Sequence, residues 1–181
     1  MKVVFLDRDG VINKEVNYCH RVEDFKYTYR CVDALSNILA ADYKIIVITN
    51  QAGIAKGMFK KNDYDELTKF YIQDLSRKGI DILDVFFCPH HIDGIIPEYT
   101  MNCMCRKPKP GMLISAIDKH SINVQSSFLV GDKLSDVEAG SAANIASLIL
   151  VRSGHEFHAP ASMAIPIYKN LFEFSLDLGA K

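Results

Sequence analysis

Short apolar runs alternate along this chain with segments in which apolar residues recur every three or four positions. The runs lie at residues 3–6, 44–49, 84–88, 128–130 and 147–151. Continuous apolar runs of this length are typical of strands that are buried on both faces of a parallel sheet. A shorter segment, residues 165–168, predicts one more short strand near the end of the chain.

The segments between these runs have the spacing of amphipathic helices, as in Tyr64, Leu67, Tyr71 and Leu75. Helices are expected over 30–42, from Asn62 or Asp63 to about Lys78, over 111–120 after Pro110, over the small residues that follow Asp136, and over 170–178. Strands that alternate with helices, without a repeat or a linker, predict an α/β fold with a doubly wound, Rossmann-like parallel sheet. We expect a single domain over 1–181.

Composition limits the function classes. The chain has 21 Lys and Arg against 22 Asp and Glu, a formal net charge of −1, which does not indicate a nucleic-acid partner. No apolar run approaches the roughly 20 residues that cross a bilayer, so no membrane partner is expected. The chain enters its first strand without a signal-peptide pattern, and we therefore expect a cytoplasmic, monomeric protein with reduced thiols.

Three of the predicted strands end in polar clusters. Asp7-Arg8-Asp9-Gly10 follows the first strand, Thr49-Asn50 ends the second, and residues 131–136 follow the fourth. The carboxyl ends of parallel strands meet at one edge of the sheet, where open α/β sheets bind ligands. Taken alone, residues 7–10 would suit a solvated turn equally well.

Together with Arg106-Lys107, which precedes a predicted helix, these clusters supply what phosphoryl transfer requires. Asp7 can attack phosphorus and Asp9 can handle the proton of the leaving group. Lysine, hydroxyl and backbone N–H donors neutralise phosphoryl oxygens. Asp7 and Asp132 offer the hard oxygen ligands that Mg²⁺ prefers, and Mg²⁺ would offset the repulsion between a carboxylate and a phosphate.

The four clusters at residues 7–10, 49–50, 106–107 and 131–136 resemble, in order and context, the four motifs of the haloacid dehalogenase superfamily of phosphatases. This resemblance implies a doubly wound sheet of that type. The segments between the motifs are short, so a large cap domain is not expected.

A closer resemblance runs from about residue 3 to residue 153. The stretches 7–13, 49–55, 88–91, 103–112 and 130–133 are similar to the family of D-glycero-D-manno-heptose-1,7-bisphosphate 7-phosphatases. It implies a phosphoric monoester hydrolase that removes the 7-phosphate of this sugar bisphosphate through an aspartyl-phosphate. The product would serve the synthesis of nucleotide-activated heptose for the lipopolysaccharide core.

The same resemblance implies roles for individual residues. Asp7 would be the nucleophile and Asp9 the general acid/base, while Thr49 and Lys107 would hold the transferred phosphoryl group. The substrate would contact Glu15, Tyr18, Asn50, Gln51, Arg106 and Lys133, with the loop from Glu15 to Tyr18 closing over the sugar. Catalytic Mg²⁺ would bind Asp7, the backbone carbonyl of Asp9, and Asp132. This sequence has Asn17 where the family is expected to have glycine, which bears on anomer preference.

The irregular segment 88–110 contains a candidate zinc site formed by Cys88, His90, Cys103 and Cys105. The Cys-x-His and Cys-x-Cys intervals are tighter than the usual spacing, but four soft ligands gather in a segment with little apolar content. Such a site would be structural, since four protein ligands leave no open position, and it would fix the direction of Arg106 and Lys107. Buried free cysteines with a surface histidine are the alternative, as is a ligand swap between His90 and His91.

The other thiols and imidazoles are assigned no role. Ordinary thiols are expected at Cys19 and Cys31, and surface histidines at His20, His120, His155 and His158. Three other functions remain open. A histidinol-phosphate phosphatase would use the same motifs, and a non-catalytic zinc-stabilised binding module would not need the full set of carboxylates. Repair of nucleic-acid phosphate ends would require a basic groove, which the sequence does not indicate.

Overall fold

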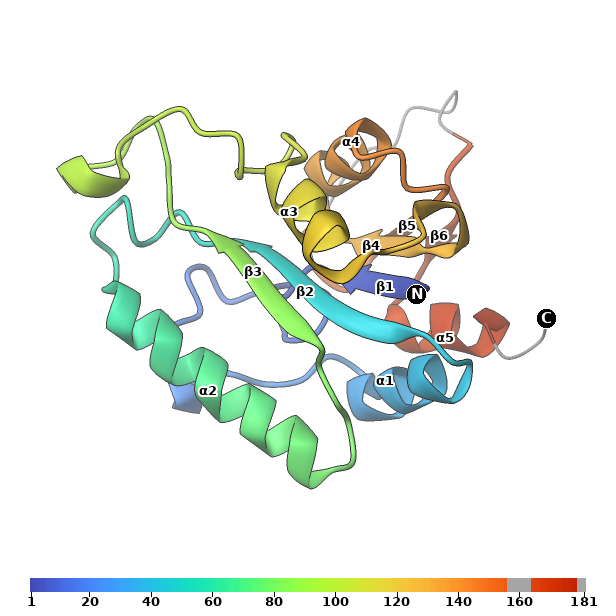
Figure 1. Cartoon of the computed structure of the whole chain (residues 1–181). Coiled ribbons are helices and arrows are strands. Elements are labelled where there is room, and N and C mark those ends of the chain that lie inside the picture. Colours follow the sequence, from blue (N-terminus) through green and yellow to red (C-terminus); the bar gives the residue numbers. More distant parts are fainter. Residues whose placement is uncertain (156–163, 179–181) are drawn as a thin grey trace.

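The computed structural model describes residues 1–155 and 164–178, so His158 lies outside the described part of the chain. Its strands form one parallel sheet in the order β3-β2-β1-β4-β5-β6 (Figure 1). The strands are β1 (Val3–Leu6), β2 (Lys44–Asn50), β3 (Asp84–Cys88), β4 (Phe128–Gly131), β5 (Ser147–Val151) and β6 (Ile167–Tyr168). All five strand pairs are parallel, which confirms the predicted sheet.

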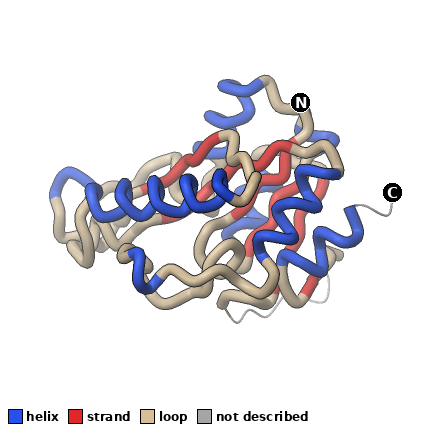
Figure 2. The backbone as a smooth tube through the Cα atoms, turned by 90° about the horizontal axis from the view of Figure 1, so that it is seen from below, coloured by secondary structure: helices blue, strands red, loops and turns tan. Residues whose placement is uncertain are grey.

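Helices cover both faces of this sheet. They are α1 (Cys31–Ala40), α2 (Lys61–Arg77), α3 (Gly111–His120), α4 (Leu134–Ala142) and α5 (Leu171–Leu178). The first core cluster contains buried residues of α1, α2 and α5, and the second contains residues of α3 and α4. Seen from below, α1, α2 and α5 lie in front of the strands (Figure 2). The sheet is therefore doubly wound, as predicted.

The apolar runs of the sequence are explained by this two-sided burial. In β1, Val4 and Leu6 contribute to the first core cluster, whereas Val3 and Phe5 contribute to the second. All four side chains are fully buried. A strand between two helical layers has no solvent-facing side, and so its sequence shows no alternation of polar and apolar residues.

The order of the strands places the edge at which a ligand can bind. The chain runs from β1 outward to β2 and β3 on one side, and later to β4, β5 and β6 on the other. Leu6, the last residue of β1, pairs with Val47 of β2 and Val130 of β4. The segments that follow these three strands consequently meet at the point where the strand order reverses, which is the usual ligand site of such sheets.

Helix α2 begins slightly before its predicted start. Its N-cap is Lys60, and Asp63 lies at the third helical position, where its Oδ2 accepts a hydrogen bond from Lys60 N at 2.7 Å. Asp63 therefore completes the cap from inside the helix, and the prediction of Asn62 or Asp63 as the cap residue was wrong. The helix ends before Gly79, whose φ of +79° is the left-handed conformation that glycine favours.

The loops between the motif-bearing strands do not form a separate large cap within the described residues. Between β2 and β3 the chain forms a loop and α2, and after β3 it forms the extended 88–110 segment (Figure 1). Among residues 1–155 and 164–178, no helix is long and apolar enough to cross a membrane.

Candidate active site

The carboxyl ends of β1, β2 and β4 border a cavity of about 480 Å³. Nine of the ten residues predicted to act in catalysis or substrate binding line it: Asp7, Asp9, Glu15, Tyr18, Asn50, Gln51, Arg106, Lys107 and Lys133. The tenth, Thr49, is buried beside them, and its Oγ1 accepts a hydrogen bond from Gln51 Nε2 at 2.8 Å. The structure thus brings together residues from four separate parts of the chain.

A buried lysine lies at the floor of the site between two carboxylates. Lys107 Nζ is 2.6 Å from Asp136 Oδ1 and 3.1 Å from Asp7 Oδ1, and it also donates to the carbonyl of Ile48 at 2.8 Å. Burial alone would lower the pKa of Lys107, but the charges of Asp136 and Asp7 raise it above its ordinary value. Lys107 is therefore a permanent cation at this position.

The two carboxylates that contact this ammonium belong to a group of three. Asp7, Asp132 and Asp136 each offer an oxygen within 4.8 Å of the others. Burial raises the pKa of Asp7 to about 6, against the lowering effect of Lys107, and burial together with Asp7 raises the pKa of Asp132. Asp132 Oδ1 is buried without a hydrogen-bond partner among the described residues. Hard oxygen atoms, an excess of negative charge and an unpaired buried oxygen fit a divalent cation.

Asp9 occupies a different environment only two residues from Asp7. Its carboxylate accepts hydrogen bonds from Arg8 Nη2 at 2.9 and 3.0 Å, from Asn13 Nδ2 at 2.9 Å and from Gln51 Nε2 at 3.0 Å. Burial raises the pKa of Asp9, but Arg8 and these hydrogen bonds lower it below its ordinary value. The carboxylate of Asp9 is therefore held by donors and is not one of the three clustered acids.

The loop that follows Asp9 contains two residues with left-handed backbone. Asn17 has φ of 52° and Tyr18 has φ of 59°. Asparagine and glycine adopt this conformation more readily than other residues, so Asn17 in place of the expected glycine preserves the backbone path. Glu15 Oε1 accepts from Asn17 N at 2.7 Å, and Tyr18 OH accepts from Lys56 Nζ at 3.3 Å across the cavity.

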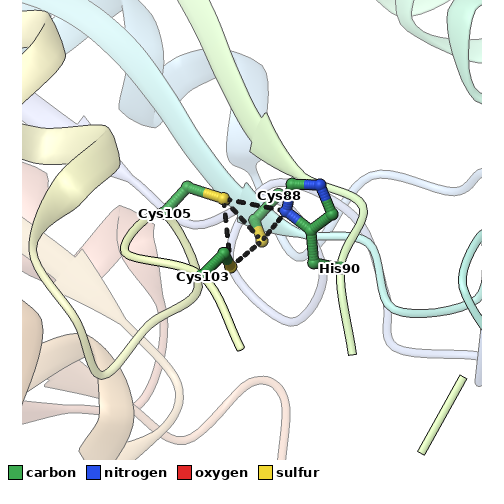
Figure 3. A group of neighbouring side chains, drawn as sticks. All are labelled: Cys88, His90, Cys103 and Cys105. Carbon is green, nitrogen blue, oxygen red and sulfur yellow. Dashed lines mark hydrogen bonds between the residues drawn. The ribbon is translucent and has the colours of Figure 1, made fainter. Parts of the chain in front are cut away.

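The four predicted zinc ligands meet beside this cavity (Figure 3). The sulfur atoms of Cys88, Cys103 and Cys105 lie 3.0 to 3.5 Å apart, and His90 Nδ1 is 3.3 Å from Cys105 Sγ. All three cysteines are free, and three thiols with one imidazole nitrogen at such distances form a donor set suited to tetrahedral zinc. His91 lies outside the cluster, because its Nδ1 accepts from Asp93 N at 3.0 Å.

This cluster is joined to the catalytic edge through the next two residues. Arg106 Nη1 donates to the carbonyl of His90 at 3.3 Å. Lys107 N donates to Asn50 Oδ1 at 3.1 Å, and Asn50 Nδ2 donates to the carbonyl of Lys107 at 3.0 Å. The end of β2 and the cysteine cluster therefore fix the backbone that presents both cations.

Sequence reasoning assigned no role to several residues of this site. Asp136 was recognised only as part of a polar cluster, and Lys56 was not singled out. His155, expected at the surface, lines the cavity and has Nδ1 at 2.7 Å and its backbone N at 2.8 Å from Asp132 Oδ2. Arg8, between the two aspartates, is fully buried. A charged residue directly after an apolar strand was the only sequence signal for Arg8, and His155 had none.

Comparisons with known proteins agree with this geometry. A family model described as HAD-hydrolase-like matches residues 104–168. The chain is 54% identical over 175 residues to D-glycero-alpha-D-manno-heptose-1,7-bisphosphate 7-phosphatase of Photorhabdus laumondii, covering 97% of this chain and 95% of that protein. It is 40% identical over 151 residues to D-glycero-beta-D-manno-heptose-1,7-bisphosphate 7-phosphatase of Escherichia coli K12, covering 83% and 79%.

A solved structure is similar over nearly its whole length. The D,D-heptose 1,7-bisphosphate phosphatase from B. bronchiseptica, complexed with magnesium and phosphate, superposes with a TM-score of 0.85 at 25% sequence identity. The match covers 98% of each chain. The similarity therefore extends through the sheet and both layers of helices.

Two glycines allow a direct test of how tightly the acid cluster is packed. Gly10 and Gly79 both have positive φ, at +85° and +79°. A Cβ on Gly10 would lie 2.4 Å from Asp132 Oδ2, whereas a Cβ on Gly79 would meet nothing within 4 Å. Gly79→Ala should cost roughly 1 to 2 kcal/mol of backbone strain, and Gly10→Ala about 1 to 3 kcal/mol more for the overlap. Thermal unfolding of both variants measures the difference, and equal losses of Tm would contradict the close approach.

Proposed function

Because the chain belongs to the haloacid dehalogenase-like family of heptose-1,7-bisphosphate 7-phosphatases, we propose that it hydrolyses the 7-phosphate of D-glycero-D-manno-heptose 1,7-bisphosphate. One observation supports this proposal above the others: a carboxylate that can act as nucleophile, Asp7, lies beside the buried cation Lys107 at the floor of a cavity. The reaction would take place in the cytoplasm and serve the synthesis of nucleotide-activated heptose for the lipopolysaccharide core.

The proposed reaction has two steps. Asp7 Oδ attacks the phosphorus atom, the bond from phosphorus to the sugar oxygen breaks, and Asp9 gives its proton to that oxygen. Asp9 then takes a proton from the water that attacks the aspartyl-phosphate, which releases phosphate and regenerates Asp7. Lys107 neutralises phosphoryl oxygens. Thr49 Oγ1 accepts from Gln51, so its own proton is available to a phosphoryl oxygen.

Two metals complete the proposal. The residues that would hold magnesium are Asp7, Asp132 and the backbone carbonyl of Asp9, and bound Mg²⁺ would offset the repulsion between the carboxylate and the phosphate dianion. Zinc would bind Cys88, His90, Cys103 and Cys105 with no open position. Its role would be to hold Arg106 and Lys107 in place, because these residues directly follow Cys105.

We further propose that the substrate is the α anomer. The relative named for the α anomer is more similar to this chain, over more of its length, than the E. coli relative named for the β anomer. Phosphate release from both anomers and from histidinol phosphate tests the function. The expected result is a kcat/KM at least about tenfold higher on the α anomer. A preference for the β anomer would overturn the anomer assignment, and a preference for histidinol phosphate would overturn the proposed function.

Mutation of Asp7 and mutation of Asp9 should have different effects on activity and stability. Asp7→Asn should be folded and inactive, because Lys107 keeps its pair with Asp136. Asp9→Asn should slow turnover by about 10²-fold or more, the scale of general acid/base catalysis. It should also lower Tm more than Asp7→Asn does, because Arg8 is left as a buried charge without its carboxylate. Rates and thermal unfolding measure both effects, and residual wild-type activity in Asp7→Asn would exclude the covalent step.

The two metals should behave differently. EDTA should stop activity at once and added Mg²⁺ should restore it, whereas about one zinc per chain should resist this treatment. Cys103→Ser should lower both zinc content and Tm. Cys31→Ser is the matched control, since Cys31 is buried in the core away from the cluster, and it should leave the zinc content unchanged. Active protein that purifies without zinc would show that the cluster does not hold a structural metal.

Arg106 is proposed to bind the phosphate that is not cleaved. It lines the cavity together with Lys56. Lys107 is already engaged at the floor of the site. Arg106 and Lys56 therefore form a cationic mouth suited to a second anionic group.

Removal of Arg106 should affect the bisphosphate selectively. A charge-assisted hydrogen bond contributes roughly 1.5–3 kcal/mol, so Arg106→Ala should reduce kcat/KM for the bisphosphate about ten- to a hundredfold. A small monophosphate should be turned over almost as before. Lys109→Ala is the control, because Lys109 is a cation of the same loop that bonds Asn102 and does not line this cavity. Equal losses on both substrates, with zinc retained, would place Arg106 on the reacting phosphoryl group instead.

A further inference from the structure

The guanidinium of Arg8 is completely buried behind the general acid proposed above. Its Nη2 donates to both oxygens of Asp9, to the carbonyl of Cys19 at 2.8 Å and to Gln51 Oε1 at 3.4 Å. Its Nε donates to Asp9 Oδ2 at 3.2 Å. Two of the three guanidinium nitrogens therefore face the catalytic carboxylate and its neighbours. The third, Nη1, is buried and has no partner among the described residues.

Three more orphaned polar atoms lie on the face of α2 that packs toward Arg8. Tyr64, Thr68 and Tyr71 recur at intervals of four and three residues, so their side chains share one side of the helix. Their hydroxyl oxygens are all buried and have no hydrogen-bond partner within the described chain. The centroid of the Tyr64 ring lies 5.9 Å from Cζ of Arg8. The ring of Tyr71 stacks on that of Phe25.

The shared helix face and the contact of the Tyr64 ring with Arg8 place these groups near one another, and the pKa values of the two phenols agree with this arrangement. Burial raises the pKa of Tyr64 to about 12 and also raises that of Tyr71. Arg8 and Thr68 each oppose that rise at both phenols. One guanidinium donor and three hydroxyls thus lie around the same part of the core, and no hydrogen bond spans the space between them within the described chain.

We propose that an internal water molecule occupies this space, bonded to Arg8 Nη1 and to the hydroxyls of α2, and that Arg8 is thereby fixed as the positioning residue for Asp9. Buried waters typically make about three hydrogen bonds to polar groups that would otherwise be unsatisfied. A water can accept from the guanidinium, donate to two hydroxyl oxygens and accept from the third hydroxyl, which gives each of the four groups one bond. Empty space beside a buried guanidinium would leave its N–H groups unpaired, at a substantial cost.

The consequence for catalysis follows from the way in which two nitrogens of the Arg8 guanidinium contact Asp9. Arg8 holds Asp9 by Nε and Nη2, so a rotation of the guanidinium would move the carboxylate that has to reach the leaving oxygen. The water would prevent this rotation by holding the opposite nitrogen. This inference rests on the proposed role of Asp9 as proton donor, and that role can be tested separately with Asp9→Asn.

Leaving-group dependence distinguishes a positioning role from a structural one. An alkyl phosphate must receive a proton as its oxygen departs, whereas 4-nitrophenyl phosphate releases a stable anion and needs little help. For Arg8→Met, kcat on the alkyl sugar phosphate should fall about 10²-fold, and kcat on 4-nitrophenyl phosphate should change by less than about threefold. Arg8→Lys keeps the charge but loses the planar pair of nitrogens that contacts Asp9. Its kcat on the alkyl sugar phosphate should lie between those of the wild type and Arg8→Met.

The hydroxyl variants keep the test decisive where Arg8→Met does not fold. Tyr71→Phe and Thr68→Val should lower kcat on the alkyl substrate by roughly three- to tenfold each, with the aryl substrate unaffected. Tyr27→Phe is the matched control: its hydroxyl bonds Asp74 and is not one of the unpaired hydroxyls, so its loss should leave both rates unchanged. A high-resolution crystal structure of the wild type should show the water within hydrogen-bond distance of Arg8 Nη1.

Each outcome bears on one inference. If Asp9→Asn lowers kcat equally on the alkyl and the aryl substrate, the proposed role of Asp9 is wrong. If Asp9→Asn discriminates between the leaving groups but the Arg8 and hydroxyl variants do not, the positioning role is wrong. A dry space between Arg8 and α2 in the crystal would overturn the water site.

Discussion

Lys107 and the two carboxylates around it constrain the whole catalytic edge. Asp7 comes from the end of β1, Asp136 from the first turn of α4, and the carbonyl of Ile48 from β2, so one ammonium joins two strands and a helix. A buried charge is tolerated only when it is paired and hydrogen-bonded, so this lysine has to stay within bonding distance of its partners. Lys107 itself lies in the irregular loop that precedes α3. The cysteine cluster and the paired bonds with Asn50 supply the rigidity that the loop sequence lacks.

This arrangement leaves the site short of positive charge. Three buried carboxylates lie together, and their repulsion, added to burial, raises the pKa values of Asp7 and Asp132 in spite of the charges of Lys107 at Asp7 and of Lys133 at both groups. Acidic groups held together in this way cost folding free energy that neutral residues would not. The same excess of negative charge would attract a divalent cation. A feature that is unfavourable for stability is therefore favourable for the proposed chemistry.

The sequence predicted the parts of this site that depend on strand order and failed where side chains from distant segments meet. Apolar runs located β1, β2 and β4, and the polar residues at their ends had to share one edge. Lys107 was recognised from the sequence as part of a cationic pair, but its specific role came from family resemblance, because nothing local reveals that it enters the sheet edge. Arg8 read as a turn residue until its burial was known. His155 lies 23 residues beyond its partner Asp132. No helical or strand periodicity relates residues so far apart, so the sequence does not predict this contact.

The environments of Asp7 and Asp9 are opposite to those their proposed roles require, and this opposition is instructive. A nucleophile must be ionised, yet burial raises the pKa of Asp7; a proton donor must be protonated, yet Arg8 lowers the pKa of Asp9. Bound substrate and metal would oppose both effects. A divalent cation beside Asp7 favours its carboxylate form, and a phosphate dianion brought near Asp9 favours its protonated form. Under the proposed mechanism, binding of the ligands would therefore move both carboxyl groups further toward their working states.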